Sequence, residues 1–212
     1  GLPAALRPHA PKKGVGVLRF TSALPPSVTY ARTGAATALT VAGAVMSFAA
    51  NAPQLTDRGL LLEAAATNLD PNSLTIGGTG WTTNASPTIT QNAATAPDGT
   101  MTAVRVRSTA SNSGPWRGSI SLATATTYTR SIWLKDNGGS VKTVRLGVGQ
   151  AVFGGAGGDR NVTVNVADGT FSNIDPVYSA TSVFAGENGW RRVSLTFTTT
   201  SASASAAFTI YG

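Results

Sequence analysis

The chain has 212 residues, enough for one large domain or a smaller domain with an appendage, and enough to bury a hydrophobic core. Only 12% of its residues are charged, and Gly, Ala, Thr and Ser replace the missing charge, which argues against an all-helical protein. The absence of cysteine excludes disulfides, zinc–thiolate sites, iron–sulfur clusters and a thiol nucleophile.

The net charge of +7 would suit an acidic partner, but the charge is unevenly distributed. Four of the sixteen Lys and Arg residues fall within residues 1–20, which contain no acid, so the rest of the chain is nearly neutral. No aromatic strand or helix motif typical of nucleic-acid binding is present, so we expect no nucleic-acid partner. No apolar run reaches about 18 residues, so we expect no membrane insertion.

The first part of the chain predicts an arm followed by short strands. Residues 1–14 combine three prolines with the Lys12-Lys13 pair, which is typical of an extended segment. Four β-type runs follow, at Val17–Thr21, Val28–Thr33, Thr37–Val41 and Ala44–Ala49, and Gly43 lies where a hairpin turn between the last two is needed.

The next stretch ends at a predicted domain boundary. Gly59–Glu63 is a short apolar run that predicts a buried strand, and Ala64–Ala66 could continue it as one helical turn. Asp70-Pro71-Asn72 breaks the chain. We therefore expect an N-terminal anchoring and oligomerisation region over residues 1–72 and a second domain over residues 73–212.

From residue 73 onward, short strand-like runs alternate with Gly- and Asx-rich turns. The runs are Thr88–Gln91, Thr102–Ser108, Trp116–Ala123, Thr127–Lys135, Thr143–Val152, Asn161–Val166, Val177–Phe184, Arg191–Thr199 and Ser205–Tyr211. Many short strands at regular spacing, with no alternating helices, predict an all-β fold: an antiparallel jelly-roll β-sandwich.

Alternation along these runs gives most strands one apolar and one polar face, as two packed sheets require. In Trp116–Ala123 the apolar face is expected to hold Trp116, Ile120 and Leu122, with Arg117 on the polar face. Arg130 is the exception, because it falls on the apolar face of Thr127–Lys135 and the sequence offers no reason for it.

Catalytic chemistry has little support in the sequence. The only histidine, His9, lies in the proline-rich arm, and Asp98, Asp136, Asp168 and Asp175 all sit beside turn residues that explain them without catalysis. We expect no enzyme and no cofactor. A structural calcium ion stays open because it needs only carboxylate and carbonyl oxygens, but no ligands are assigned.

Trp133 is the most informative aromatic residue because it falls on the polar face of its strand, with Lys135 beside it. If the sheets pair suitably, Arg145 or Arg117 would lie nearby. An exposed indole among cations could stack on a sugar ring and pair with a uronate or sialate carboxylate. The alternative is that Trp133 is covered by the N-terminal segment or by a neighbouring subunit.

Several stretches resemble tailed-phage structural proteins. Residues 28–69 resemble a segment common in such proteins, through Thr29–Thr33, Arg58–Glu63 and Thr67–Leu69. The remainder resembles the carbohydrate-binding-module-like jelly roll that follows it there, through Gly80-Trp81, Ala96–Thr100, Thr127–Thr129, Trp133–Lys135, Val166–Thr170 and Asn188–Val193. The departures are Ala64–Ala66, where the family usually has charged residues, and Arg130, where it usually has an aromatic residue.

The resemblance implies a protein on the virion surface, such as a head spike, head fibre or tail fibre of a phage or gene transfer agent. It implies other virion proteins as partners, a homo-oligomer (a trimer first, a pentamer next) and adsorption to cell-surface polysaccharide. Arg7, Lys12 and Lys13 would then belong to an arm that docks on a partner. The alternatives are a purely structural connector or decoration protein and, with less support, a polysaccharide-degrading enzyme.

Overall fold

The computed structural model describes residues 8–9, 17–18, 30–57, 59–61, 68–70, 73 and 75–212. The chain forms two compact units, Gly1–Ala66 and Thr67–Gly212, and each is described by itself. The boundary predicted from the sequence, between residues 72 and 73, falls a few residues after this division. Arg7, Lys12, Lys13 and Ala64–Ala66 lie outside the described residues.

The described part of the chain is all-β, as the sequence predicted. Every strand pair is antiparallel, and the helical segments are two short 3-10 turns, η1 (Gln150–Phe153) and η2 (Glu187–Gly189). Neither of these turns, the only helices among the described residues, has the length and apolar character needed to cross a membrane.

The first unit consists of two-stranded pairs. They are β1 (Pro8–His9) with β2 (Val17–Leu18), β3 (Ala36–Leu39) with β4 (Val45–Phe48), and β5 (Leu55–Thr56) with β6 (Gly59–Leu60). Gly43 makes the predicted turn between β3 and β4 with φ of 91°, a conformation that glycine adopts without steric cost. The residues 30–33 of the run predicted as Val28–Thr33 form no strand.

Arg32 holds the two ends of the β3–β4 hairpin together. Its guanidinium donates to the backbone oxygens of Gly34 (2.7 Å), Phe48 (3.2 Å) and Ala49 (2.6 Å). Its backbone N–H donates to the side chain of Asn51, and Asn51 N–H returns a bond to the Arg32 carbonyl. Arg32 is therefore accounted for as a structural residue of this unit.

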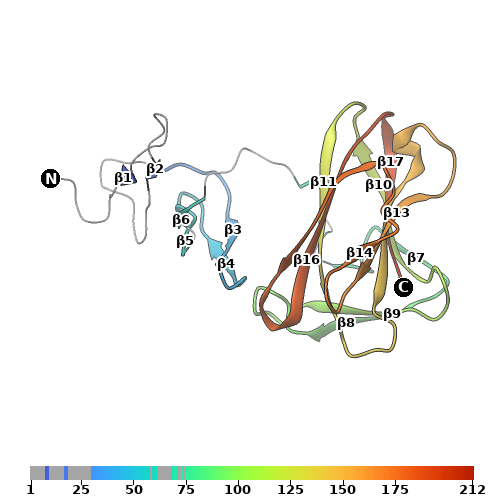
Figure 1. Ribbon diagram of the computed structural model, residues 1–212, viewed down its shortest axis with the longest axis horizontal. Coiled ribbons are helices and arrows are strands. Elements are labelled where there is room, and N and C mark those ends of the chain that lie inside the picture. Colours follow the sequence, from blue (N-terminus) through green and yellow to red (C-terminus); the bar gives the residue numbers. More distant parts are fainter. Residues whose placement is uncertain are drawn as a thin grey trace. The chain divides into compact units, whose positions relative to one another are not determined.

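The second unit is a sandwich of a six-stranded and a three-stranded sheet, seen as facing layers in Figure 1. The six-stranded sheet has the order β14 (Phe171–Ser172), β13 (Asp159–Asn165), β12 (Thr143–Gly149), β17 (Ser203–Tyr211), β10 (Gly114–Leu122) and β7 (Trp81–Asn84). The three-stranded sheet has the order β11 (Thr127–Lys135), β16 (Trp190–Thr198) and β15 (Tyr178–Ala185). A separate hairpin pairs β8 (Thr88–Ala94) with β9 (Ala103–Arg107).

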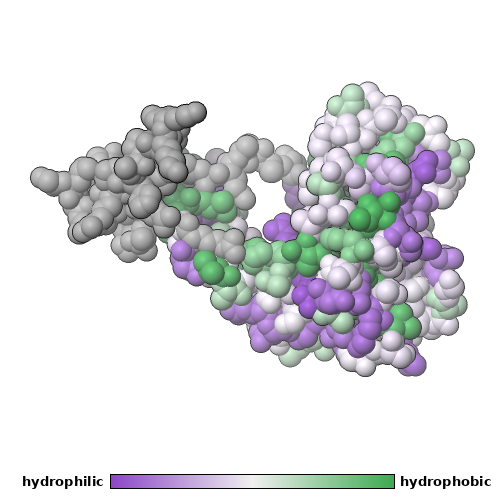
Figure 2. Space-filling model, in the orientation of Figure 1, coloured by the Kyte–Doolittle hydropathy of each residue, from purple (hydrophilic) through white to green (hydrophobic). Residues whose placement is uncertain are grey.

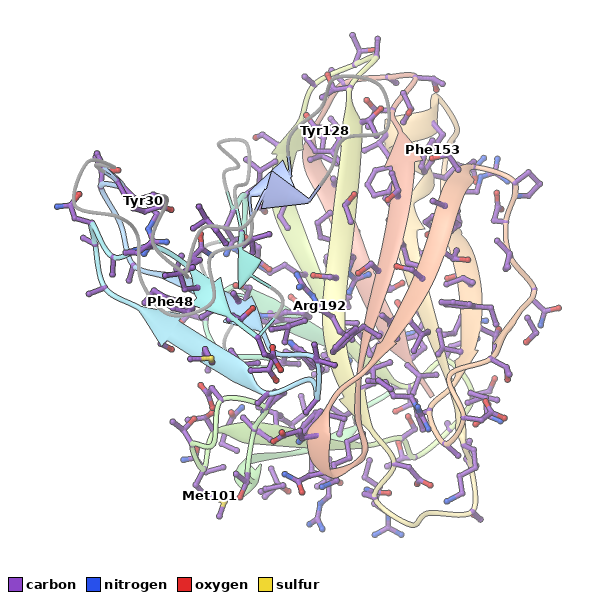
Figure 3. The ribbon with its side chains drawn as sticks, turned by 60° about the vertical axis from the view of Figure 1, so that its left-hand side comes forward. Tyr30, Phe48, Met101, Tyr128, Phe153 and Arg192 are labelled. Carbon is purple, nitrogen blue, oxygen red and sulfur yellow. The ribbon has the colours of Figure 1, made fainter. Side chains whose placement is uncertain are left out.

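The core lies between the two sheets and is built from the inward residues of both. Its fully covered side chains include Leu146, Val162, Val193, Leu195 and Phe197. Phe197 contacts Tyr128, Phe153 and Tyr178, with ring centroids 6.2, 5.8 and 6.3 Å away, and Figure 3 labels Tyr128 and Phe153. The alternation predicted for β12, β11 and β16 is therefore confirmed.

Arg130 spans the core, which explains its place on an apolar face. From β11 its guanidinium donates to the carbonyls of Gly147 (2.9 Å) and Thr209 (3.1 Å) on the opposite sheet. It also lies 4.9 Å from the centre of the Phe208 ring. Burial lowers the pKa of Arg130 to about 10. The residue that the sequence left unexplained ties the two sheets together.

A bulge in β10 corrects the predicted faces of that strand. The register with β17 shifts between Arg117 and Ile120, and Ser119 has φ of 59°. Ile120 points inward as predicted, but the extra residue reverses the alternation before it. Arg117 therefore turns inward beside Phe208, and Trp116 turns outward beside Thr209, the opposite of the prediction.

The predicted Asx turns are confirmed, and two of them repeat one geometry. In Asp98-Gly99-Thr100 and in Asp168-Gly169-Thr170 the aspartate accepts bonds from both the N–H and the hydroxyl of the threonine. Both glycines have φ of 84°. These bonds lower the pKa of both carboxyl groups. Asp136 and Asp175 accept similar backbone bonds from the residue two positions later.

Candidate functional site

Trp133 lies on the outer face of the three-stranded sheet, as the sequence predicted, and it is half-buried there. Its neighbour across β11 and β16 is Arg192, and Arg192 is in turn the neighbour of Phe184 on β15. The Trp133 and Phe184 rings meet edge to face, with centroids 6.5 Å apart. One row across the sheet thus holds an indole, a guanidinium and a phenyl ring.

Gly186 lets the indole settle against the end of β15. A Cβ at this position would come within 2.7 Å of the Trp133 ring, closer than side-chain carbons pack. The Arg192 side chain, exposed and labelled in Figure 3, donates to the Ser131 hydroxyl at 3.1 Å. Both contacts hold the row in one arrangement on the sheet.

The next row of the same face pairs Lys135 with Trp190. Lys135 is exposed, and its Nζ lies 5.9 Å from the centre of the Trp190 ring. The Trp190 indole N–H donates to the Thr95 carbonyl at 3.0 Å, which fixes that ring as well. We call Trp133, Phe184, Trp190, Lys135 and Arg192 the outer-face cluster.

The outer-face cluster is positively charged. Among the described residues, no carboxylate lies within 4 Å of Lys135 or Arg192, and the three ion pairs found there involve other cations. The acids nearest in sequence are Asp136, which pairs with Lys142 at 2.7 Å, and Glu187 in η2, which is exposed. Two accessible cations beside aromatic rings form a surface that can bind an anionic group.

The face continues as a field of hydroxyl groups toward the other end of the strands. Thr127 bonds Thr198, and Thr129 bonds Thr196, each at 2.9 Å between hydroxyl oxygens. Figure 2 shows much of the visible surface of the second unit as pale, the colour of intermediate hydropathy, between hydrophilic and hydrophobic areas. The threonine pairs extend the outer face beyond the cluster with uncharged polar groups.

The other two cations expected near Trp133 lie elsewhere. Arg117 and Arg145 belong to β10 and β12 of the six-stranded sheet, so the expectation that they lie beside Trp133 on one sheet face is wrong. Arg117 is buried, pairs with Asp70 at 3.0 Å and donates to the Gly80 carbonyl at 2.6 Å. Because the β10 bulge turns it inward, Arg117 is not accessible to a ligand.

Arg145 points to the outer face of its own sheet. Its guanidinium lies 5.3 Å from the centre of the Tyr211 ring and donates to Asn112. The cation beside Trp133 is Arg192, and not Arg117 or Arg145, the two that the sequence led us to expect there. The alternation in Arg191–Thr199 put Arg192 on a polar face, but only the pairing of β16 between β11 and β15 makes it the neighbour of Trp133.

The four tryptophans divide between core and surface. Trp81, Trp116 and Trp190 each follow a Gly or Pro at the start of a strand-like run, which predicts core-edge residues. Trp81 packs against the core as predicted. Trp116 and Trp190 lie on outer faces instead, as the bulge in β10 and the pairing with Lys135 require. Aromatic surface is therefore present on both sides of the sandwich.

No metal centre can be assigned from the part of the chain that the structure describes, where no three His, Cys, Asp or Glu side chains come together in a way that could hold an ion. Comparison with protein-family models and with curated proteins finds no match.

Proposed function

We propose that the protein is a non-enzymatic surface component of a phage-like particle, a spike or a fibre, whose β-sandwich unit binds the surface polysaccharide of a host cell. The observation that carries the binding activity is the outer-face cluster, in which three aromatic rings and two cations share one sheet face. Its place on a virion, and its homo-oligomeric state with a trimer ahead of a pentamer, rest on the sequence resemblance over residues 28–211.

The cluster has the two kinds of group that an acidic saccharide needs. The rings of Trp133 and Trp190 offer apolar surface to the C–H face of a pyranose. Arg192 and Lys135 offer charge to carboxylate groups along the polymer, and a guanidinium can bind a carboxylate with two parallel bonds. Uronate- or sialate-containing polymers combine both features in each repeat.

The arrangement of the side chains in the cluster favours binding of a repeating polymer over binding of a small molecule. Its rings and cations lie in successive rows along an open sheet face, and neighbouring rows on one face of a strand are about 7 Å apart. An extended polymer can contact several rows at once, and an oligomer would multiply such contacts.

The decisive experiment measures binding of the full chain, in its native oligomeric state, to immobilised polygalacturonate, polysialate and dextran. We expect the two acidic polymers to bind and Trp133→Ala to weaken binding at least tenfold. Met101→Ala, which removes an exposed apolar side chain outside the cluster, is the matched control and should bind normally. Thermal unfolding and light scattering establish that each variant keeps its fold and its oligomeric state.

The opposite result would support the structural alternative. If the folded oligomer binds neither the acidic polymers nor a panel of bacterial capsules, polysaccharide binding is wrong. Trp133 would then be expected in a contact between subunits, and Trp133→Ala should lower the oligomeric state in light scattering.

A further inference from the structure

The outer face of the six-stranded sheet contains buried polar atoms that no described protein group satisfies. Five such atoms occur among the described residues, and three of them belong to neighbouring strands of this face: Arg145 Nε on β12, Asn161 Oδ1 on β13 and Thr209 Oγ1 on β17. Thr209 is only 2% exposed. An unsatisfied buried polar group costs about 1–3 kcal/mol, so a cluster of three on one face requires an explanation.

Two of these atoms, Asn161 Oδ1 and Thr209 Oγ1, lie over a glycine. Gly147 on β12 is paired with Asn161 on one side and with Thr209 on the other. A Cβ at this position would lie 2.3 Å from Asn161 Oδ1 and 2.5 Å from Thr209 Oγ1. Any other residue would push the two side chains apart, so glycine allows two polar groups to lie over the backbone of the central strand.

The floor of this region continues without large side chains. Two positions along the same face of β12 is Gly149, where a Cβ would come within 3.3 Å of the Ala207 side chain. Glycine and alanine thus form a low strip in the middle of the sheet. The strip contributes no large side chain of its own, and Gly147 is covered by the polar side chains of Asn161 and Thr209.

Aromatic side chains border the strip on two sides. Trp116, turned outward by the β10 bulge, is the cross-strand neighbour of Thr209. Tyr211 lies under the Arg145 guanidinium, and the pKa of its phenol is raised by burial and by the charge of Asp159. Unlike the outer-face cluster, this region has one cation, Arg145, and one anion, Asp159, so its charges balance.

We propose that this region, defined by Trp116, Arg145, Gly147, Asn161 and Thr209, is a second saccharide-binding surface and that its ligand is an uncharged sugar. Arg145 Nε–H can donate, Asn161 Oδ1 can accept, and the Thr209 hydroxyl can do both. Sugar hydroxyl groups match this mixture because each both donates and accepts, and Trp116 offers a ring for stacking. Ligand entry requires rotation of the covering side chains, a common change at binding surfaces. This site is independent of the outer-face cluster.

Thr209→Val gives a sharp test because it removes the hydroxyl and keeps the shape of the side chain. Three neutral probes (cellohexaose, maltohexaose and mannohexaose) and the acidic probe hexagalacturonate are titrated against the full chain by calorimetry. We expect at least one neutral probe to bind and Thr209→Val to weaken it about tenfold without lowering the melting temperature. Thr209→Ser should restore binding. Thr143→Val, which changes an exposed threonine of β12 on the same sheet face, should leave binding unchanged.

Two further results decide the proposal and separate it from the proposed function. Trp133→Ala should leave neutral-probe binding intact, because Trp133 lies on the other sheet. If no neutral probe binds the folded protein, or if Thr209→Val lowers the melting temperature while binding stays the same, the second site is wrong and the Thr209 hydroxyl has only a structural role. Either result leaves acidic-polymer binding to be judged on its own variants.

Discussion

The two outer faces of the sandwich use their polar groups in opposite ways. On the three-stranded sheet the hydroxyl groups bond to one another, as in the Thr129–Thr196 pair, and the groups that can bind a ligand are two exposed cations. On the six-stranded sheet the charges balance, and the groups that can bind a ligand are the buried, uncharged side-chain oxygens of Asn161 and Thr209 over Gly147. The three-stranded face can therefore attract a ligand over a distance through its charge, whereas the six-stranded face can bind one only through close contact.

This difference leads to different expectations for salt. Exposed charges are screened over about 8–10 Å at physiological ionic strength, so binding at the outer-face cluster should weaken as salt is added. Hydrogen bonds to buried neutral atoms are affected far less. A substitution can therefore disturb both faces together or weaken binding at one of them alone.

The largest effect is expected from Phe197→Ala, which should affect both faces alike. Phe197 is completely buried in the core that supports the two sheets. Its loss should lower the free energy of unfolding by about 3–5 kcal/mol, measured by urea denaturation. Selective loss of one binding activity at a temperature where the variant is folded would show that the core does not support the faces equally.

Arg130→Met should weaken the six-stranded face more than the three-stranded face. The side chain loses its bonds to the carbonyls of Gly147 and Thr209, which lie directly in the proposed second site. We expect a loss of about 1.5–3 kcal/mol in urea denaturation. Hydrogen exchange at Gly147 and Thr209 should increase while exchange on β16 changes little. Equal increases on both sheets would contradict the role of Arg130 as a tie to that strand pair.

Arg192→Gln should weaken ligand binding at the three-stranded face alone, without changing the stability of the fold. The side chain is exposed, so the free energy of unfolding should change by less than about 0.5 kcal/mol. Binding to polygalacturonate should weaken about tenfold, or about 1.4 kcal/mol, and should become less sensitive to salt. Arg105→Gln removes an equal charge from the exposed face of β9 and is the matched control. An equal loss in both variants would mean that net charge, and not the cluster, drives binding.

The smallest effect concerns the turn between β13 and β14, which both sheets contact. Arg191 on the three-stranded sheet donates to the carbonyls of Val166 and Ala167, beside Asp168. Because bonds from Thr170 lower the pKa of Asp168 in the folded chain, its contribution is present above its ordinary pKa of 3.8 and is lost as the pH falls through the folded value.

Asp168→Ala should therefore unfold slightly more easily than the wild type at pH 7, and the two should converge near pH 2. Thermal unfolding across this range measures the difference. Asp98→Ala, in the matching turn of the β8–β9 hairpin, should behave in the same way. A difference that persists at pH 2 would show that the turn geometry, and not the ionised carboxylate, carries the effect.

Sequence patterns predicted the fold class and many local features because these depend on neighbouring residues. The strand Thr127–Lys135 was predicted with its observed bounds, and Gly43 and Asp168 form the expected turns. Alternation also placed Trp133 and Lys135 on an outer face. These features follow from side-chain periodicity and turn chemistry, which a single segment contains.

The remainder depends on which strands become neighbours. The partner of Trp133 could not be predicted because Arg192 is 59 positions away and no local pattern joins β11 to β16. The exposed face of Trp116 depends on a bulge that only the pairing with β17 reveals. The reason for Arg130 likewise lies on the opposite sheet, at Gly147 and Thr209.

The bulge in β10 gives this strand a tolerance to a change in chain length. Two residues, Gly118 and Ser119, lie opposite a single residue of β17, so deleting one of them would restore regular alternation. With Ile120 held in the core, Arg117 would still pair with Phe208 and face inward, and Trp116 would still pair with Thr209 and face outward. A single-codon deletion at this place should therefore leave both faces of the strand as they are. Related chains can gain or lose one residue here and still present the same side chains to the core and to a ligand.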